Sequence, residues 1–387
     1  MMSVIGLNAR RTGIPVRLAF NPMTLIIDFH EDLAWNILNL NRDYTQSAYQ
    51  IRKTEENSPI PEFNGNTLLG WDEYQAGKVA VVAGTLFCVP KRLDQGKYAT
   101  RVYETPQQAH QCYRDNLDVY YRLTDDHPEK FRLLLTQSDL SSHLAIWENH
   151  LDEKSDVLPP VGILILMEGA EGVRDPAEVE QWFEWGVRMI GPAWAGNRYC
   201  GGTREPGPLT KAGYELLAQM ADLKMILDIS HMDHQSARQA LDFYPGQVIA
   251  SHANAEALIN DLPTNRHLKD ETIQQLIERD GVMGIVPLND FLDWKWRQHG
   301  GRASMSLDHV VAQIDYVCQR AGNTQHVALG TDFDGGFGVE SVPAEIDTIA
   351  DLPKLAPRLT EKGYNEDDIE RIFNGNWIRI MKNNLPA

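Results

Sequence analysis

Short apolar runs rich in Val, Ile and Leu recur along the chain, and each run is apolar on both of its faces. Parallel strands that are buried on both sides of a sheet show this pattern. The runs that predict strands are Leu25–Ile27, Val79–Ala83, Val161–Leu166, Val187–Ile190, Met225–Ile229, Val248–Ala250, Val282–Val286 and Val327–Leu329.

Segments with helical spacing of apolar residues fill most of the intervals between these runs. Thr210 and Asp270 stand where two of the helices begin, so both are predicted N-caps. Alternating strands and helices predict βα units and a parallel sheet. Eight such strands in 387 residues favour a closed (β/α)8 barrel of the TIM type over an open sheet. The clearest helical segments are Thr210–Leu223, His234–Phe243, Asp270–Arg279 and Ser306–Ala321.

Two long segments interrupt the alternation in the first half of the chain. Residues 39–77 are polar, contain several Pro and Gly residues and carry no strand pattern, which predicts an insertion after the first strand. Residues 92–158 are mostly helical in pattern and form a second predicted insertion. Since the sequence has no linker and no internal repeat, we expect residues 1–387 to form one barrel domain.

Composition and charge narrow the choice of partners. The chain is 43% hydrophobic and 23% charged, with a formal net charge of -18, and an acidic protein of this kind is a poor partner for nucleic acid. No run of about 18 apolar residues predicts a membrane span, and the first 20 residues do not resemble an export signal. The cysteines form no CxxC pair, so we expect four reduced thiols and a cytoplasmic location. They are Cys88, Cys112, Cys200 and Cys318.

Metal-ligand side chains follow five of the eight predicted strands, always at the carboxyl end. A barrel builds its active site at this end, so we expect these side chains to converge. Three imidazoles and three carboxylates suit zinc or a similar divalent metal, and they exceed what one four-coordinate site needs. Two metals bridged by a carboxylate and a water account for the surplus. The residues are His30, Asp32, Glu168, His231, His252 and Asp332.

Each of these residues has a structural explanation when it is considered alone. A buried His often only bonds to backbone, Glu168 could cap a helix that begins near Gly169, and Asp332 and Asp334 lie in a Gly-flanked turn where Asp is common. The same placement at five strand ends is what indicates a metal site.

The sequence around these residues resembles the membrane (renal) dipeptidases, peptidase family M19 of the amidohydrolase superfamily. The resemblance begins in the stretch Asp28–Trp35 and runs in order from about Ile26 to Met381. No single motif is specific, but the ordered set is. The other matching stretches are Met167–Gly169, Leu227–His231, Ala250–Asn254, Gly330–Gly335 and Phe373–Arg379.

The resemblance implies a role for each matching residue. His30 and Asp32 would bind a first zinc ion, and His231 and His252 a second. Glu168 would bridge the two ions.

Two further matches concern the substrate. The resemblance implies that Asp332 takes a proton from the bridging water and passes it to the leaving amine. It also implies that Arg266, in the stretch Asn265–Asp270, holds the carboxylate of the substrate. The structural alternative for Arg266 is a surface residue at the entry to a helix.

One position departs from the family pattern. Where well-studied members have a His that contacts the substrate carbonyl, this chain has Trp194, and Asn197 nearby could supply a polar contact instead. An indole donates one hydrogen bond but carries no charge, and loss of an oxyanion donor typically costs a factor of roughly 10²–10³ in rate. The Gly-rich basic loop at 198–207 either shapes a different substrate pocket or forms a flexible turn.

Three functions are compatible with these residues. The first is a zinc-dependent dipeptidase that hydrolyses small dipeptides with a metal-activated bridging water. The second is a metallohydrolase of the same superfamily for another small amide, an N-acyl amino acid or a lactone, and Trp194 is the main reason to consider it. The third is a non-catalytic metal-binding protein, against which the presence of Asp332 argues. The family also leads us to expect a homodimer.

Overall fold

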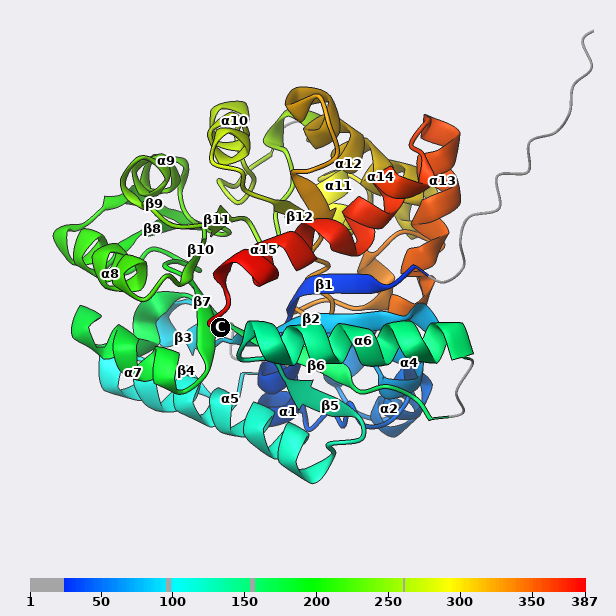
Figure 1. Ribbon diagram of the computed structural model, residues 1–387, viewed down its shortest axis with the longest axis horizontal. Helices are drawn as coiled ribbons and strands as arrows, with labels where there is room; N and C mark the ends of the chain where they lie inside the picture. The colour runs from blue at the N-terminus through cyan, green and yellow to red at the C-terminus, as the bar shows by residue number, and fades with distance from the viewer. Residues whose placement is uncertain (1–23, 95–98, 154–156, 260–261) are drawn as a thin grey trace, which may run out of the picture.

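The computed structural model describes residues 24–94, 99–153, 157–259 and 262–387 (Figure 1). The stretch in which the sequence predicts no export signal falls in residues 1–23 and lies outside the described residues. In the part of the chain that the structure describes, no helix has both the length and the apolar character that a membrane crossing requires.

All eight predicted strands are present, and neighbours along the chain pair in parallel (Figure 1). Six of them form one sheet in the order β1-β2-β6-β7-β10-β11, and β12 pairs with β13. Their bounds are Ile26–Glu31 (β1), Val79–Leu86 (β2), Val161–Glu168 (β6), Val187–Gly191 (β7), Ile226–Asp228 (β10), Val248–Ile249 (β11), Met283–Ile285 (β12) and Val327–Leu329 (β13).

Single bridges complete the ring of strands. A parallel bridge between Ala250 and Met283 joins β11 to β12, and another between Glu31 and Phe333 joins β1 to the segment after β13. At the same seam, the backbone N–H of Asp332 donates to the carbonyl oxygen of His30 at 3.1 Å. The prediction of a TIM-type (β/α)8 barrel is confirmed.

Helices surround the strands, with α5 along one side and α8, α9, α10 and α12 following round the ring (Figure 1). The long helices predicted from the sequence are confirmed within a residue or two of their expected ends. The helices are Leu33–Leu40 (α1), Ala48–Glu55 (α2), Ile60–Asn64 (α3), Trp71–Gly77 (α4), Pro106–Asp126 (α5), Gln137–Glu153 (α6), Val179–Glu184 (α7), Lys211–Asp222 (α8), His234–Phe243 (α9), Asp270–Glu278 (α10), Asn289–Leu292 (α11), Leu307–Ala321 (α12), Leu355–Lys362 (α13), Glu366–Glu370 (α14) and Asn376–Asn384 (α15).

One of the two predicted N-caps is correct and the other is wrong. The hydroxyl of Thr210 accepts from the backbone N–H of Gly213 at 3.1 Å and caps α8. Asp270 is instead the first residue of α10, and Lys269 occupies the cap position. The Asp270 carboxylate accepts from the Tyr316 hydroxyl at 2.7 Å and pairs with an Arg on α12, so this neighbouring helix uses the group that capping would need.

The amino end of the barrel is closed by two helices that cross in front of it in Figure 1, α6 and α15. Trp377 of α15 stacks on Phe29 of β1 with ring centroids 4.0 Å apart, and its indole N–H donates to the carbonyl of Leu329 at 2.7 Å. The apolar side chains of both helices belong to one buried cluster with those inside the barrel. Ligands therefore reach the barrel from the opposite, carboxyl end.

The predicted insertion at 39–77 folds into short helices and is tied to the loop after β13. The buried Asp334 carboxylate accepts from the Tyr44 hydroxyl at 2.7 Å and from the Leu68 backbone N–H at 2.8 Å. It also pairs with the guanidinium of Arg42 at 3.0 Å. Asp334 therefore links the insertion to the turn that carries Asp332.

Short strands that the sequence pattern did not predict lie outside the eight-stranded ring or at its margin. The second insertion is mostly helical as predicted, through α5 and α6, and contributes β5 beside β6. Two small strand pairs are also present. β3 pairs with β4 in parallel near the start of this insertion, and β8 and β9 form an antiparallel hairpin after β7. These strands are Val89–Pro90 (β3), Val102–Tyr103 (β4), Phe131–Leu133 (β5), Cys200–Gly202 (β8) and Glu205–Leu209 (β9).

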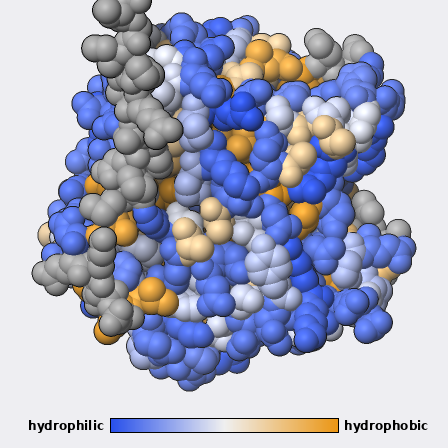
Figure 2. Space-filling view, turned by 90° about the vertical axis from the view of Figure 1, so that its right-hand side faces the viewer, coloured by the Kyte–Doolittle hydropathy of each residue, from blue (hydrophilic) through white to orange (hydrophobic). Residues whose placement is uncertain are grey.

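The surface and the cysteines agree with the composition. The face drawn in Figure 2 is mostly hydrophilic, with small separate hydrophobic patches. The four cysteines are free thiols, and all but the partly exposed Cys112 are buried.

Candidate metal centre

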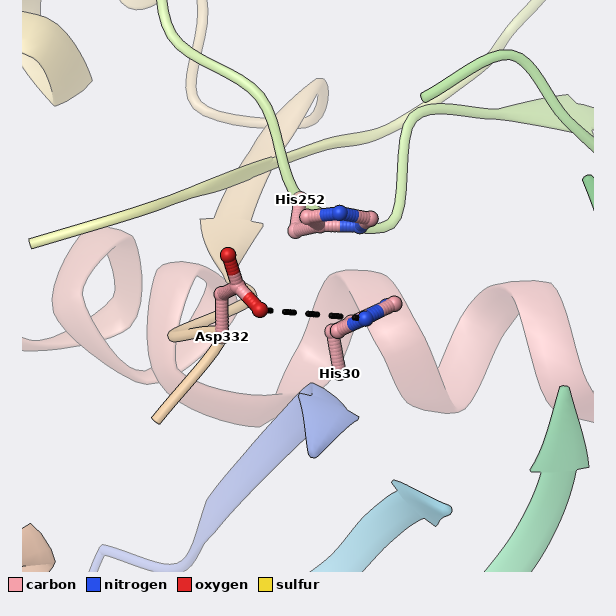
Figure 3. A group of neighbouring side chains, drawn as sticks. All are labelled: His30, His252 and Asp332. Carbon is pink, nitrogen blue, oxygen red and sulfur yellow. Dashed lines mark ion pairs between the residues drawn. The ribbon is translucent and has the colours of Figure 1, made fainter. Parts of the chain in front are cut away.

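The predicted ligand residues meet at the carboxyl end of the barrel. His30 lies in β1 and Glu168 is the last residue of β6, whereas His231, His252 and Asp332 follow β10, β11 and β13. Figure 3 shows His30, His252 and Asp332 pointing toward one another from three separate parts of the ring. In the described residues, Asp32 joins His30 and Glu168 in a group whose ligand atoms all lie within 4.8 Å of one another.

The carboxylate of Glu168 lies at the centre of the three imidazoles. Its Oε1 atom is 3.0 Å from Nε2 of His231, 3.4 Å from Nε2 of His252 and 3.7 Å from Nε2 of His30. Glu168 therefore belongs both to the group with His30 and Asp32 and to the group with His231 and His252. This is the position that a carboxylate shared by two metal ions requires.

A hydroxyl group contacts Nδ1 of each imidazole, the ring nitrogen opposite to the Nε2 atom that faces Glu168. Ser251 Oγ lies 2.8 Å from Nδ1 of His252 and 3.3 Å from Nδ1 of His30. Thr203 Oγ1 lies 3.0 Å from Nδ1 of His231. Metal-binding histidines are usually oriented by such a contact at the second nitrogen, which leaves Nε2 for the metal. Neither hydroxyl was predicted from the sequence.

A further carboxylate, that of Asp228, holds the Ser251 hydroxyl in place. Asp228, in β10, accepts from Ser251 Oγ at 2.5 Å and from the backbone N–H groups of Ser251 and Ser230 at 2.9 and 3.0 Å. A carboxylate, a hydroxyl and an imidazole thus form a chain that ends at the metal centre. The signals for Asp228 in the sequence were its position three residues before His231 on a buried strand and its place in the matching stretch Leu227–His231.

Burial dominates the electrostatics of the site. Desolvation lowers the pKa of all three imidazoles well below the ordinary His value. Desolvation, followed by repulsion between neighbouring carboxylates, raises the pKa of Glu168 and Asp332 well above their ordinary values. It also raises the pKa of Asp32 to about 6. The neutral imidazoles offer lone pairs, and a divalent cation would favour the ionised carboxylates.

The donor atoms fit divalent metal ions. Nε2 of His30 is buried without a hydrogen-bond partner among the described residues. Nε2 of His231 lies only 3.0 Å from Nε2 of His252. If each Nδ1 donates to its hydroxyl, two lone pairs face each other, and a cation between imidazoles and carboxylates removes that repulsion. Nitrogen and carboxylate donors are the ones that zinc and similar metals use in hydrolases.

Two of the site residues have an unusual backbone conformation. His231 has a φ angle of 64° and Asp332 one of 58°, in the left-handed region that residues with a side chain rarely adopt. Such a conformation typically costs about 1–3 kcal/mol and persists where surrounding structure enforces it, often at functional sites. Here His231 points toward Glu168, and Asp332 toward His30 and His252.

Arg266 is a buried cation with free donors. Only 3% of the residue is exposed, and Nη2 donates to the carbonyl oxygen of His252 at 2.8 Å. Nε and Nη1 have no hydrogen-bond partner among the described residues. The guanidinium carbon lies 5.3 Å from the centre of the Phe291 ring. This arrangement holds the side chain in place and leaves two buried donors without a protein partner among the described residues.

A cavity of about 610 Å³ opens over the metal centre. Asp32, Glu168, His231, Arg266 and Asp332 form its polar floor. The other residues that line it are Trp35, Phe87, Val89, Leu93, Asp94, Ala99, Trp194, Thr203, Arg204, Pro263, Thr264, Leu288, Phe291, Trp294, Gly335 and Gly336.

Trp194 and Asn197, which the sequence places at or near the position where well-studied family members have a His, differ in their position relative to the cavity. Trp194 lines the cavity, whereas Asn197 does not. The Asn197 side chain accepts from the backbone N–H groups of Tyr199 and Cys200 at 2.8 and 3.2 Å and donates to Pro192 at 2.8 Å. These contacts shape the loop, so the structure does not support a substrate contact by Asn197.

The Gly-rich loop at 198–207 forms the hairpin of β8 and β9. Thr203 and Arg204, at its tip, line the cavity over the metal centre. Of the two interpretations of this loop, the structure favours the one in which it shapes the substrate pocket.

Comparisons with known proteins identify the family of the chain. Residues 20–385 match the family described as membrane dipeptidase (peptidase family M19). A protein encoded in the pqqA 5' region of Klebsiella pneumoniae, itself uncharacterized, is 34% identical over 228 residues, which cover 56% of this chain and 80% of that protein. The dipeptidase ataJ of Aspergillus terreus is 26% identical over 300 residues, 70% of this chain and 67% of that protein. The match spans about half the length of several other curated relatives.

Solved structures show the same fold. A metallopeptidase of Rhodobacter sphaeroides, liganded with a phosphinate mimic of the dipeptide L-Ala-D-Ala, aligns with a TM-score of 0.73 at 21% identity. The alignment covers 94% of this chain and 99% of that chain.

Proposed function

Since the chain belongs to the membrane dipeptidase family, peptidase family M19, it is a metal-dependent dipeptidase by family, and we propose that it hydrolyses small dipeptides with two zinc ions. The observation that carries the proposal is the position of Glu168 Oε1, shared by two groups of ligands below the free guanidinium donors of Arg266. A pair of metal sites beside a carboxylate-binding cation suits a small amide with a free C-terminus.

The residues divide into two ligand sets. His30 and Asp32 would hold one ion, His231 and His252 the other, and Glu168 both. When bound, the ions supply an activated water at neutral pH and polarise the carbonyl oxygen of the scissile amide.

Asp332 would move the proton of the reaction. Its Oδ1 atom lies 3.9 Å from Nε2 of His30, on the same cavity floor as Glu168. From this position the carboxylate accepts a proton from the attacking water and delivers it to the leaving amine nitrogen.

Arg266 would orient the substrate. The two nitrogens without protein partners can donate charge-assisted hydrogen bonds to the C-terminal carboxylate of a dipeptide. Because Arg266 itself is held by His252 and Phe291, a bound carboxylate places the amide at a fixed distance from the ligand cluster.

The proposed function is tested by hydrolysis of L,L- and L,D-dipeptides by protein of measured zinc content. We expect turnover that disappears with a chelator and returns when zinc is added back. A fully metallated protein that cleaves no dipeptide would contradict the proposal. It would point to the second candidate, hydrolysis of another small amide or a lactone, which the placement of Trp194 on the cavity wall favours.

Replacing Arg266 with Ala is expected to raise KM for dipeptides about 10- to 100-fold, the usual cost of losing hydrogen bonds to a charged group. Dipeptide amides, which lack the carboxylate, should show no comparable change. The measurement is steady-state kinetics on matched acid and amide substrates, with metal content and melting temperature as controls for folding. Equal losses on both substrates would exclude the carboxylate contact.

A further inference from the structure

The cavity over the metal centre has aromatic residues on two opposite sides. We call Trp35, Phe87 and Trp194 the Trp194 wall; they come from α1 and from the loops after β2 and β7. The other side carries Phe291 and Trp294, from α11 and the loop after it. The two sides therefore belong to different parts of the ring of strands.

Arg266 and Phe87 line the same cavity and come from opposite parts of the ring of strands. Arg266 follows β11 and Phe87 follows β2, and these two strands are four steps apart in the ring of eight. Glu168 ends β6 and His231 follows β10, two strands that lie between β2 and β11 in the sheet, and both residues line the same cavity. A dipeptide with its carboxylate on Arg266 and its amide over the cluster therefore extends its N-terminal residue toward Phe87.

The Trp194 wall is formed before any substrate binds. Trp35 and Phe87 are only 5% and 8% exposed, and they belong to one buried cluster against which Trp194 packs. The rings of Trp194 and Phe87 have centroids 5.2 Å apart and are tilted by 53°. The Trp194 ring also lies 6.2 Å from the imidazole of His231. An apolar surface thus extends from the cavity wall to the edge of the metal centre.

We propose that the Trp194 wall is the subsite for the side chain of the substrate's N-terminal residue, and that it selects aromatic and large aliphatic residues there. The inference rests on the proposed function, because it assumes a dipeptide held by Arg266. Trp194, which replaces the polar residue expected from the family, thereby determines specificity: burying one large apolar side chain against it favours such substrates at least about tenfold.

The test compares kcat/KM for dipeptides that share a C-terminal Ala and differ in the first residue. We expect Phe and Leu to exceed Gly and Ala at least about tenfold in the wild-type protein. Trp194→Ala should reduce this ratio to about twofold, and Trp194→Phe should restore most of it. A wild-type preference for Lys or Asp in the first position, or an unchanged ratio in Trp194→Ala, would overturn the inference.

Trp294→Ala is the matched control, since it removes the same side chain from the opposite side of the same cavity. We expect it to change selectivity for the C-terminal residue and to leave the ratio for the N-terminal residue intact. Loss of the N-terminal ratio in this variant would show that neither tryptophan acts locally and would overturn the assignment.

Equilibrium binding separates failure of the subsite from failure of the proposed function. The probes are two phosphinate dipeptide mimics, with a Phe-like and an Ala-like N-terminal residue, titrated into zinc-loaded protein by calorimetry. We expect the Phe-like probe to bind at least about tenfold more tightly, and Trp194→Ala to abolish the difference. Equal affinities would overturn the inference even where dipeptides are hydrolysed. Absence of dipeptide hydrolysis would instead contradict the proposed function.

Discussion

Replacing Asp332 with Asn is expected to lower kcat for dipeptides by about 10²–10⁴-fold, the usual contribution of a positioned acid or base. Asn has the same shape as Asp but cannot accept a proton from the attacking water. Asn also tolerates the left-handed conformation with φ 58° that this position requires. The backbone hydrogen bond from residue 332 to His30 is unaffected by the substitution. The loss should therefore be chemical rather than structural.

The decisive measurement is single-turnover hydrolysis together with the metal content of the same preparation. We expect the Asp332→Asn protein to retain its metal ions and to lose turnover. Unchanged turnover would refute the role of Asp332 in proton transfer. Loss of metal together with activity would make Asp332 a ligand instead, as its proximity to His30 and His252 allows.

Asp334→Asn is a matched control in the same turn. Asp334 also has a left-handed backbone, with φ 63°, but its buried carboxylate contacts Tyr44, Leu68 and Arg42 and belongs to none of the ligand groups, although its charge contributes to the raised pKa of Asp32. Removing this charge weakens the attachment of the first insertion, so we expect a lower melting temperature. Its effect on kcat should be much smaller than that of Asp332→Asn.

The sequence was sufficient to predict the barrel and the residues that meet at its carboxyl end. Strands buried on both faces are nearly pure apolar runs, so a His or a carboxylate directly after such a run is conspicuous. Glu168 ends one strand and His252 follows another, but the ring of parallel strands brings every carboxyl strand end to the same face. The order of parallel strands in the barrel is therefore enough to predict that residues far apart in the sequence meet at its carboxyl end.

Features that depend on contacts between distant segments could not be predicted in this way. Thr203 orients His231 from 28 residues away, and Ser251 reaches His30 across 221 residues. Thr203 does not differ in sequence from an ordinary surface Thr, and nothing in the sequence around Ser251 indicates its contact with His30. The same holds for the contacts of Asn197, whose side chain bonds to the backbone of its own loop in a way that the sequence pattern does not show.

Replacing Glu168 with Gln is expected to remove most of the bound metal and with it the activity. Oε1 of Glu168 lies within 3.0–3.7 Å of Nε2 of all three histidines, so this atom is the point that both ligand sets share. A neutral amide oxygen is a much weaker ligand than a carboxylate. We expect metal affinity to fall at least about 100-fold, since even groups that only orient ligands contribute 10- to 100-fold.

The same substitution should have the opposite effect on the metal-free protein. The amide nitrogen of Gln can donate to the imidazole lone pairs, and a neutral amide avoids the burial and the carboxylate repulsion that raise the pKa of the wild-type Glu168 carboxyl. The Glu168→Gln protein should therefore melt at a higher temperature than metal-free wild type. It should also gain little from added zinc, because a ligand stabilises a fold only in proportion to its binding.

These expectations are measured as metal ions per chain and as melting temperature with and without zinc. Glu171→Gln serves as the control, because Glu171 is a buried carboxyl three residues further along that belongs to none of the ligand groups. Glu171→Gln should keep the wild-type metal content and the wild-type response to zinc. If Glu168→Gln also kept both, the shared carboxylate would not hold the metals, and the two-metal proposal would lose the observation on which it rests.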